Sequence, residues 1–446
     1  MRKKLILLLS VLIVVSMACP LFSTQAATFQ NDVETTTESL YLYNLNFETP
    51  VYEKNSQEER APASTTKIMT YIVTIEHVED PDNTVVTAKP EVLDLLAGTG
   101  SSLSCVLPNE ELTVTQLLHC LMLPSGNDAA MVLADYVGNG DIQAFVDMMN
   151  EKAQELGCSH THFMNPHGLY DPEHYTTAED LAKIARHAMD TPKFMEITSK
   201  TTYELPPSNV RSTPKTLQNT NSMMVSSSVY YYQYVKGIKT GWLDESGKCL
   251  VSSAMKDGYS YLCVALGGKD KDDDGLKYDG AMVDSRRLYK WAFENLEKKV
   301  IVSKDKVVAE IPLELAWQKD RLHLYPEEAV EALLPSDVDP SSITITPNDD
   351  VVANVTAPVK QGTVLGSATL SYANQELATV NLVASEDVER SELLYLMNGI
   401  KNVVTSKWFL LAVGLLVILF VVYLVISTIY NKRNKRRRKV KKYRNL

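Results

Sequence analysis

The apolar residues of this chain follow a helical pattern over much of its first half. Residues 68–75 are apolar on all sides rather than along one stripe, and Pro62 and Ser64 before them are helix-start signals. We therefore predict a helix that is buried in the middle of a domain. Further helices are expected at residues 112–123, 129–136, 141–156, 176–189 and 284–296.

Strand-type alternation lies on either side of these helices. Residues 39–52 and 234–242 each suggest a strand, and residues 250–255 and 259–267 predict a hairpin around Lys256-Asp257-Gly258. From about residue 298 to 385 the chain has short Val-, Ile- and Thr-rich runs between Pro and Gly turns, which is typical of a small all-β domain. Strands are expected there at residues 300–311, 343–347, 363–372 and 377–383.

Both ends of the chain carry membrane signals. Residues 1–26 combine three basic residues, an apolar run and a small-residue cleavage site, which indicates a secretory signal peptide. Residues 408–430 contain no charge and are long enough to span a hydrocarbon core of about 30 Å, so we predict a transmembrane helix, preceded by a helical stalk at residues 386–407. Ten of the sixteen residues 431–446 are Lys or Arg, which places this tail in the cytoplasm and the rest of the mature chain outside.

The charge of the exported part argues against a polyanion-binding protein. The chain has 44 basic and 55 acidic residues, and thirteen of the basic ones lie in the leader and the tail, which leaves a formal charge of −24 outside. We therefore expect no nucleic-acid partner. The five cysteines after the leader are scattered, so we expect mostly buried thiols, although Cys249 and Cys263 lie in neighbouring predicted strands and could be close enough to pair.

Ser64 and Lys67 supply the first candidate chemistry. They are three residues apart at the start of the predicted buried helix, so both side chains lie on one face of its first turn. A serine hydroxyl needs a base to take its proton, and a lysine that burial keeps neutral can be that base. The pair alone is a weak signal, because Ser-x-x-Lys also occurs at Ser212, Ser253 and Ser303.

Two further motifs follow in order. Ser125 and Asn127 lie on a tight loop before a helix, where a hydroxyl can relay a proton and an amide can hold a substrate amide. The alternative is that Asn127 or Asp128 caps that helix, and both readings can hold together. The third motif could bind a substrate carboxylate. Lys239 would supply positive charge, Thr240 a hydroxyl, and Gly241 room for close backbone approach.

Three histidines, His160, His162 and His167, fall within eight residues. They lack the spacing of a zinc site, since neither His-Glu-x-x-His nor a suitable Cys pair is present. We interpret them as rings whose nitrogens hold a turn together, and we expect neither a metal nor a cofactor.

With Ser64-Thr65-Thr66-Lys67, Ser125-Gly126-Asn127 and Lys239-Thr240-Gly241 in this order, the chain resembles the penicillin-recognising serine enzymes. It is most similar to the low-molecular-mass penicillin-binding proteins that are D-alanyl-D-alanine carboxypeptidases, through stretches such as residues 165–169 and 219–221. The resemblance implies an α+β transpeptidase/β-lactamase-like domain, with an antiparallel sheet flanked by helices and a helical subdomain. The predicted segments are then a signal peptide (1–26), the catalytic domain (27–297), a β-rich domain (298–385), a stalk (386–407), a transmembrane helix (408–430) and a basic tail (431–446).

The resemblance also implies the substrate and a role for each motif residue. The substrates would be peptidoglycan stem pentapeptides, which lose their terminal D-alanine, and β-lactams would be covalent inhibitors. Ser64 would be the acylated nucleophile, Lys67 its base and Ser125 a proton relay, while Asn127 would hold the substrate amide. Lys239 and Thr240 would bind the terminal carboxylate, and the backbone N–H groups of Ser64 and Trp242 would form the oxyanion hole. A tryptophan at position 242 departs from the smaller aromatic or histidine common there, and it narrows the expected cleft.

Other functions use the same motifs. A D,D-endopeptidase would need the same residues, and the sequence leaves this alternative open. A class A β-lactamase adds a Glu-x-x-Leu-Asn segment that does not occur between Ser125 and Lys239. A non-catalytic, membrane-tethered β-lactam-binding or cell-wall-binding protein is disfavoured, because the motifs are intact and a sixteen-residue tail is too short for a signalling domain.

Overall fold

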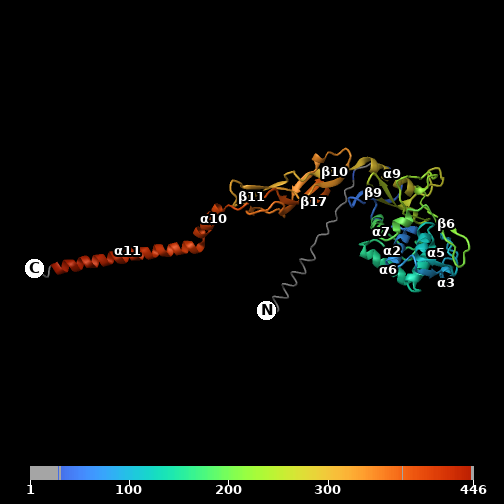
Figure 1. Ribbon diagram of the computed structural model, residues 1–446, viewed down its shortest axis with the longest axis horizontal. Helices are drawn as coiled ribbons and strands as arrows, with labels where there is room; N and C mark the ends of the chain where they lie inside the picture. The colour runs from blue at the N-terminus through green and yellow to red at the C-terminus, as the bar shows by residue number, and fades with distance from the viewer. Residues whose placement is uncertain (1–28, 30–31, 374, 443–446) are drawn as a thin grey trace. The chain divides into compact units, whose positions relative to one another are not determined.

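The computed structural model describes residue 29 and residues 32–373 and 375–442, so the predicted signal peptide lies outside the described residues. The chain forms two compact units. Unit 1 contains the described residues up to Lys299 together with Ala332–Asp339, and unit 2 contains Val300–Glu331 and the described residues from Pro340 onward. Figure 1 colours both units by position in the chain.

Unit 1 is built on a five-stranded antiparallel sheet with the strand order β2-β1-β9-β8-β7. Its side chains alternate between two cores because successive residues of a strand point to opposite faces. Leu262 and Val264 of β9 belong to one core, whereas Tyr261 and Cys263 belong to the other. The strands are β1 (Ser39–Asn44), β2 (Thr49–Lys54), β7 (Lys239–Leu243), β8 (Gly247–Lys256) and β9 (Tyr259–Gly268).

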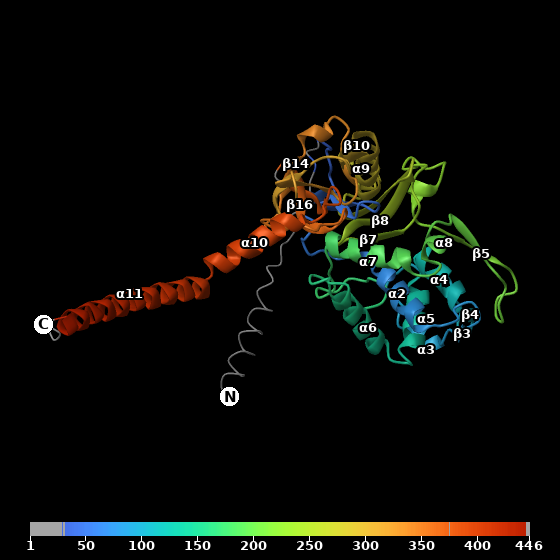
Figure 2. The same ribbon diagram turned by 60° about the vertical axis from the view of Figure 1, so that its left-hand side comes forward.

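Helices cover both faces of this sheet. Helix α9 (Gly280–Asn295) packs on one face against β8 and β9, and α7 (Ala178–Asp190) packs on the other against β1 and β9. Figure 2 shows the remaining helices grouped beyond α7, on the side of the sheet opposite α9. They are α2 (Lys67–His77), α3 (Pro90–Asp94), α4 (Val114–Met122), α5 (Asn127–Val137), α6 (Ile142–Glu155) and α8 (Phe194–Thr198).

The predicted central helix is confirmed. All residues from Lys67 to Ile75 of α2 are buried, and α2 contacts α4, α5, α6 and α7. A helix surrounded by other helices has no solvent face, which is why its sequence is apolar on all sides.

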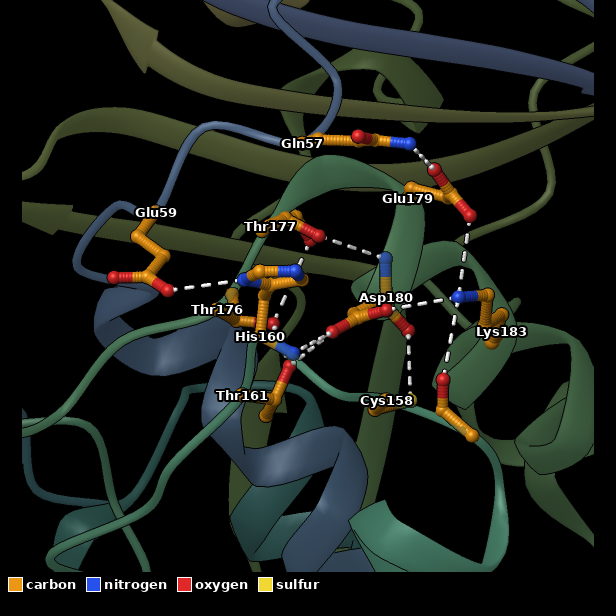
Figure 3. Close-up of polar contacts among 11 residues, drawn as sticks. Gln57, Glu59, Cys158, His160, Thr161, Thr176, Thr177, Glu179, Asp180 and Lys183 are labelled. Atoms are coloured by element: carbon orange, nitrogen blue, oxygen red, sulfur yellow. Dashed lines mark hydrogen bonds and ion pairs between the residues drawn. The ribbon is translucent and has the colours of Figure 1, made fainter. Parts of the chain in front are cut away.

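The predicted helix starts and ends are also confirmed, with short shifts. Helix α4 begins at Val114 because Thr113 caps it in a capping box with Gln116. Helix α7 begins at Ala178 because the Thr177 side chain accepts the N–H of Asp180, as Figure 3 shows. Short elements join the helices: the 3-10 turns η1 (Ala63–Thr66) and η2 (Ser222–Met224), and strands β3 (Val85–Thr87), β4 (Glu111–Thr113), β5 (Thr202–Leu205) and β6 (Lys215–Gln218).

Two strand predictions in unit 1 were too long. Residues 39–52 form the two strands β1 and β2 rather than one, because the chain turns between them and Glu48 has φ +48°. Strand β7 begins only at Lys239, since Gly237 at φ +85° interrupts the extended backbone before it. The hairpin of β8 and β9 is confirmed: Lys256 pairs with Tyr259, and Asp257 and Gly258 both have positive φ, as a type I′ hairpin turn requires.

Unit 2 contains a six-stranded sheet with the order β14-β16-β17-β12-β11-β15. The predicted strand at residues 300–311 was wrong as a single element, because exposed Ser303–Lys306 separates β10 from β11. Strands β12, β13 and β15 were not predicted. Between residues 296 and 384 the elements follow in chain order as β10 (Leu296–Val302), β11 (Ala309–Glu314), β12 (Arg321–Pro326), β13 (Val330–Pro335), η3 (Pro340–Ser342), β14 (Thr344–Pro347), β15 (Val355–Thr356), β16 (Val364–Tyr372) and β17 (Gln375–Ala384).

Two helices follow, α10 (Glu392–Thr405) and α11 (Lys407–Lys442). Within the described residues, Lys407–Arg433 of α11 is the one stretch long and apolar enough to cross a membrane. Neither α10 nor this stretch of α11 contributes to a core, since no residue of α10 is buried and the apolar window of α11 is fully exposed.

Candidate active site

Ser64 lies in the 3-10 turn η1, and Lys67 is the first residue of α2 directly after it. This tight turn brings Lys67 Nζ to 2.9 Å from Ser64 Oγ, the contact that the spacing of the two residues predicted. Lys67 Nζ also donates to the carbonyl oxygen of His167 over 2.8 Å. The amine therefore has a fixed position beside the hydroxyl.

The surroundings of Lys67 favour its neutral form. The side chain is completely buried, and this burial lowers its pKa well below the usual value. The positive charge of Lys239 lowers the pKa further, while the carboxylate of Asp128 opposes the shift. A neutral amine has a lone pair that can accept the Ser64 proton.

The second motif lies at the start of α5. Ser125 has φ +67°, and both Ser125 and Asn127 are buried. Among the described residues Asn127 Oδ1 has no hydrogen-bond partner, although it is buried. Burying a carbonyl oxygen without a hydrogen-bond partner costs free energy. A ligand N–H that donates to Asn127 Oδ1 would remove this cost.

The capping alternative for Asn127 is wrong, because the N-cap of α5 is Gly126, which has no side-chain cap. Asp128 is not the N-cap either, but its carboxylate accepts the N–H of Ala129 in the first turn of α5 over 2.9 Å. The same carboxylate accepts hydrogen bonds from the backbone N–H and hydroxyl of Ser104 (2.9 and 2.7 Å) and from the N–H of Val106 (3.0 Å). The carboxylate thus ties a neighbouring loop to the start of α5.

The third motif forms the start of β7, the edge strand of the sheet. Lys239 is buried, its Nζ donates to the carbonyl oxygen of Thr240 over 2.8 Å, and burial lowers its pKa to about 7. A Cβ added to Gly241 would lie 3.0 Å from the backbone nitrogen of Ser64. Strand β7 therefore approaches the Ser64 turn closely at a glycine, as the motif predicted.

Trp242 lies at the exposed edge of this motif. Its side chain is 49 % exposed, and the Lys248 ammonium lies over its ring at 4.7 Å from the centroid. The two residues are opposite each other in the β7–β8 pair. The indole is thus held in place on the strand that adjoins Ser64.

Two residues outside the three motifs, His167 and Thr220, contact the site. His167 supplies the carbonyl that fixes Lys67, and the hydroxyl oxygens of Thr220 and Thr240 lie 2.5 Å apart. Thr220 is placed by its neighbours: Asn219 donates to the carbonyl oxygens of Thr198 and Lys200, and Asn221 donates to Gly237 O. Both residues belong to stretches that carried the resemblance, at residues 165–169 and 219–221, so a signal for them was present.

The comparisons with known proteins agree with this geometry. A family model described as D-alanyl-D-alanine carboxypeptidase matches residues 25–270, and one described as the C-terminal domain of penicillin-binding protein 5 matches residues 296–390. The chain belongs to the D-alanyl-D-alanine carboxypeptidase family. It is a serine-type D-Ala-D-Ala carboxypeptidase with an α+β transpeptidase-like domain and a β-rich C-terminal domain.

Individual relatives cover most of both chains. The carboxypeptidase DacF of Bacillus subtilis is 30% identical over 344 residues, which is 76% of this chain and 83% of that protein. The carboxypeptidase DacC of Escherichia coli is 28% identical over 348 residues, 76% of this chain and 80% of that protein. Among solved structures, penicillin-binding protein 5 from Haemophilus influenzae has a TM-score of 0.62 at 25% identity and covers 81% of this chain and 100% of its own.

The cysteines and the clustered histidines of this carboxypeptidase lie outside its three motifs. All five cysteines in the described part are free thiols, four of them buried, so the expectation of buried thiols is confirmed and Cys249 and Cys263 do not pair. His162 Nδ1 lies 2.7 Å from Glu173 O, and His167 Nδ1 accepts the N–H of Leu169, so these two rings hold turns as predicted. For His160 the prediction was wrong, because its Nδ1 lies 3.1 Å from the carboxylate of Glu59, which is distant in the sequence. Within the described residues no group of three His, Cys, Asp or Glu side chains could hold a metal ion.

Proposed function

We propose that this carboxypeptidase removes the terminal D-alanine from peptidoglycan stem pentapeptides through an acyl-enzyme on Ser64. The observation that carries the proposal is the 2.9 Å contact between Ser64 Oγ and a completely buried Lys67 whose pKa is lowered. None of the other three Ser-x-x-Lys pairs stands at the start of a buried helix. Hydroxyl activation by a neutral lysine therefore belongs to Ser64.

In the first step, Lys67 takes the Ser64 proton as Ser64 Oγ attacks the carbonyl carbon of the penultimate D-alanine. The tetrahedral oxyanion accepts hydrogen bonds from the backbone N–H groups of Ser64 and Trp242. The C–N bond then breaks, and Ser125 relays the proton from Lys67 to the leaving D-alanine nitrogen. In the second step, Lys67 takes a proton from a water molecule, which attacks the ester carbonyl. The bond between the acyl carbon and Ser64 Oγ then breaks, the shortened peptide is released, and the protonated Lys67 returns the proton to Ser64 Oγ.

The other motif residues hold the peptide during these steps. Lys239 and the Thr240 hydroxyl bind the terminal carboxylate, and Asn127 Oδ1 accepts the N–H of a substrate amide. This role is supported by the lack of a protein partner for that buried oxygen within the described residues. Gly241 lets β7 pack closely against the turn that carries Ser64, since a Cβ there would lie 3.0 Å from the Ser64 nitrogen. Penicillin, which has a carboxylate and a reactive amide, would acylate Ser64 in the same way.

We place the enzyme in the cell membrane with a single span. Helix α11 supplies an apolar stretch at Lys407–Arg433, and the basic residues that follow it favour the cytoplasmic side. The catalytic unit then lies on the extracytoplasmic side, where stem peptides are found.

The decisive experiment is the intact mass of the full chain in detergent after incubation with penicillin. We expect the parent protein to gain the mass of one penicillin and Ser64→Ala to gain none. Ser212→Ala, which removes the serine of another Ser-x-x-Lys pair, is the matched control and should be acylated like the parent. An adduct that persists on Ser64→Ala would overturn the assignment.

A further inference from the structure

The residue before the proposed nucleophile has an unfavourable backbone conformation. Ala63 has φ +47°, in the left-handed region, and its side chain is buried. A non-glycine residue in this region is strained and persists only where its surroundings hold it. Because Ser64 follows Ala63 directly in η1, the backbone conformation of Ala63 sets the direction of the Ser64 side chain. A group that fixes Ala63 therefore also positions Ser64.

Three hydrogen bonds in series end at the carbonyl oxygen of Ala63. The N–H of Met164 donates to His174 Nδ1 over 3.0 Å, and His174 Nε2 lies 2.8 Å from Thr66 Oγ1. Thr66 Oγ1 donates to Ala63 O over 2.8 Å. Because the hydroxyl gives its one hydrogen to Ala63, His174 Nε2 must be the donor to Thr66.

This arrangement requires the neutral imidazole with its proton on Nε2. An imidazolium would turn an Nδ1–H toward the N–H of Met164. Burial lowers the pKa of His174 to about 4, against a raising effect of Asp171 and with a smaller lowering effect of His162. The ring also packs edge-on against Phe163, with centroids 5.6 Å apart.

The segment that carries His174 is fixed to the chain that leads into the Ser64 turn. The backbones of Arg60 and Thr176 exchange two hydrogen bonds of 2.8 and 2.9 Å. The Thr176 hydroxyl lies 2.9 Å from that of Thr161, which is also 3.0 Å from the Asp180 carboxylate, as Figure 3 shows. The segment that carries His174 is therefore held by its backbone at Arg60 and by side chains at Thr161 and Asp180.

We infer that His174 is a positioning residue for the nucleophile: through Thr66 it fixes the carbonyl of Ala63 and with it the turn that presents Ser64 to Lys67. The inference rests on the proposed role of Ser64. Hydrogen bonds in series polarise one another in a buried site, so the loss of one weakens the others. The same loop also supplies His167 O to Lys67, so a single segment positions both the hydroxyl and its base.

The test separates the rate constant of penicillin acylation from the noncovalent dissociation constant, on the full chain in detergent. His174→Phe keeps an aromatic ring next to Phe163 and removes both hydrogen bonds of the imidazole. We expect the acylation rate constant to fall roughly 10- to 100-fold while the dissociation constant changes less than about threefold, because misorientation acts on the reacting geometry. Thr66→Val should have the same effect, and Thr66→Ser, which keeps the hydroxyl, should retain most of the rate.

Two further variants exclude a general loss of structure. The double variant His174→Phe/Thr66→Val should be no slower than the slower single variant, because both changes break one series of bonds. His162→Phe, on the same loop with a half-buried ring that contacts the carbonyl oxygen of Glu173, should acylate like the parent.

A folded His174→Phe protein that acylates at the parent rate, or single effects that multiply in the double variant, would overturn the inference. If His174→Phe does not fold, the comparison of Thr66→Val with Thr66→Ser decides the question. An adduct on Ser64→Ala would instead overturn the proposed function, whatever the His174 variants show.

Discussion

Two buried lysines have opposite requirements in the proposed mechanism. Lys67 must be neutral to accept a proton, whereas Lys239 must be charged to bind a carboxylate. Burial lowers the pKa of both side chains, and the charge of Lys239 adds to the shift on Lys67. The charge on a protonated Lys239 therefore has two uses: it binds the substrate carboxylate, and it helps to keep Lys67 neutral.

The pH dependence of kcat/KM should follow from these two groups. As pH falls, Lys67 becomes protonated and can no longer accept the Ser64 proton, so kcat/KM decreases at the acidic end. As pH rises through about 7, the free enzyme loses the Lys239 charge, and KM for the peptide increases. Because a bound carboxylate stabilises the ammonium, kcat should be less affected than KM at the alkaline end.

Steady-state release of D-alanine from about pH 5 to about pH 10 checks this prediction. Lys239→Arg is the informative variant, because a guanidinium stays charged over this range. Its alkaline increase in KM should disappear, whatever its absolute activity. A parent enzyme whose KM is constant above pH 7 would contradict the role given to Lys239.

At the scale of elements, the site depends on close packing between segments that are distant in sequence. Gly168 has φ +88°, and a Cβ there would lie 1.9 Å from Ala63 O and 2.9 Å from Thr66 Oγ1. The loop of residues 165–169 is thus pressed against η1, and Asn165 Oδ1 holds it by accepting the N–H of Gly168 over 2.7 Å. No side chain fits between the loop and the turn that carries Ser64.

Gly168→Ala should therefore destabilise unit 1 and slow acylation together. The positive φ accounts for on the order of 1 kcal/mol, and the overlap with Ala63 O should bring the total loss to about 3 kcal/mol or more. The matched control is Gly140→Ala, because Gly140 has φ +94° but open space around its Cβ position.

Thermal unfolding and penicillin acylation of both variants provide the measurement. Gly140→Ala should lose only the conformational part, about 1 kcal/mol, and acylate at the parent rate. Equal losses of stability in the two variants would contradict the close packing of the loop on η1.

At the scale of the whole molecule, α10 and α11 are exposed helices at the end of the described chain. No residue of α10 is buried, and the apolar stretch of α11 is exposed along its whole length. Exposed apolar surface of this extent needs a non-aqueous environment, and a bilayer supplies one. The helices should therefore determine where the enzyme resides without contributing to its chemistry.

A chain that ends at residue 390, before α10, should be found in the soluble fraction after lysis and should acylate within about twofold of the full chain. A chain that ends at Tyr430 keeps the apolar helix and loses only the basic tail, so it should remain with the membranes. Fractionation followed by labelling with a fluorescent penicillin measures both properties. Membrane retention of the shorter chain would contradict α11 as the anchor.

Local patterns in the sequence predicted most helices and the three motifs, because helix periodicity, start signals and motif spacing are properties of neighbouring residues. The buried helix α2 and the cap of α7 by Thr177 were both predicted for this reason. The strands at residues 39–52 and 300–311 were less well predicted, since each is divided by a turn without a strong Gly or Pro signal. Asn127 was a plausible cap by residue type, and only the backbone of Gly126 decided otherwise.

By itself, the sequence determined which residue types are available at Ser64, Lys67 and the other motif positions, and where the apolar ends of the chain lie. Only the tertiary structure decided their chemical state. The pKa of Lys67 depends on burial and on the charge of Lys239, a residue far away in the chain. The same holds for His174, whose contact with Thr66 joins residues 108 positions apart and so leaves no local pattern in the sequence.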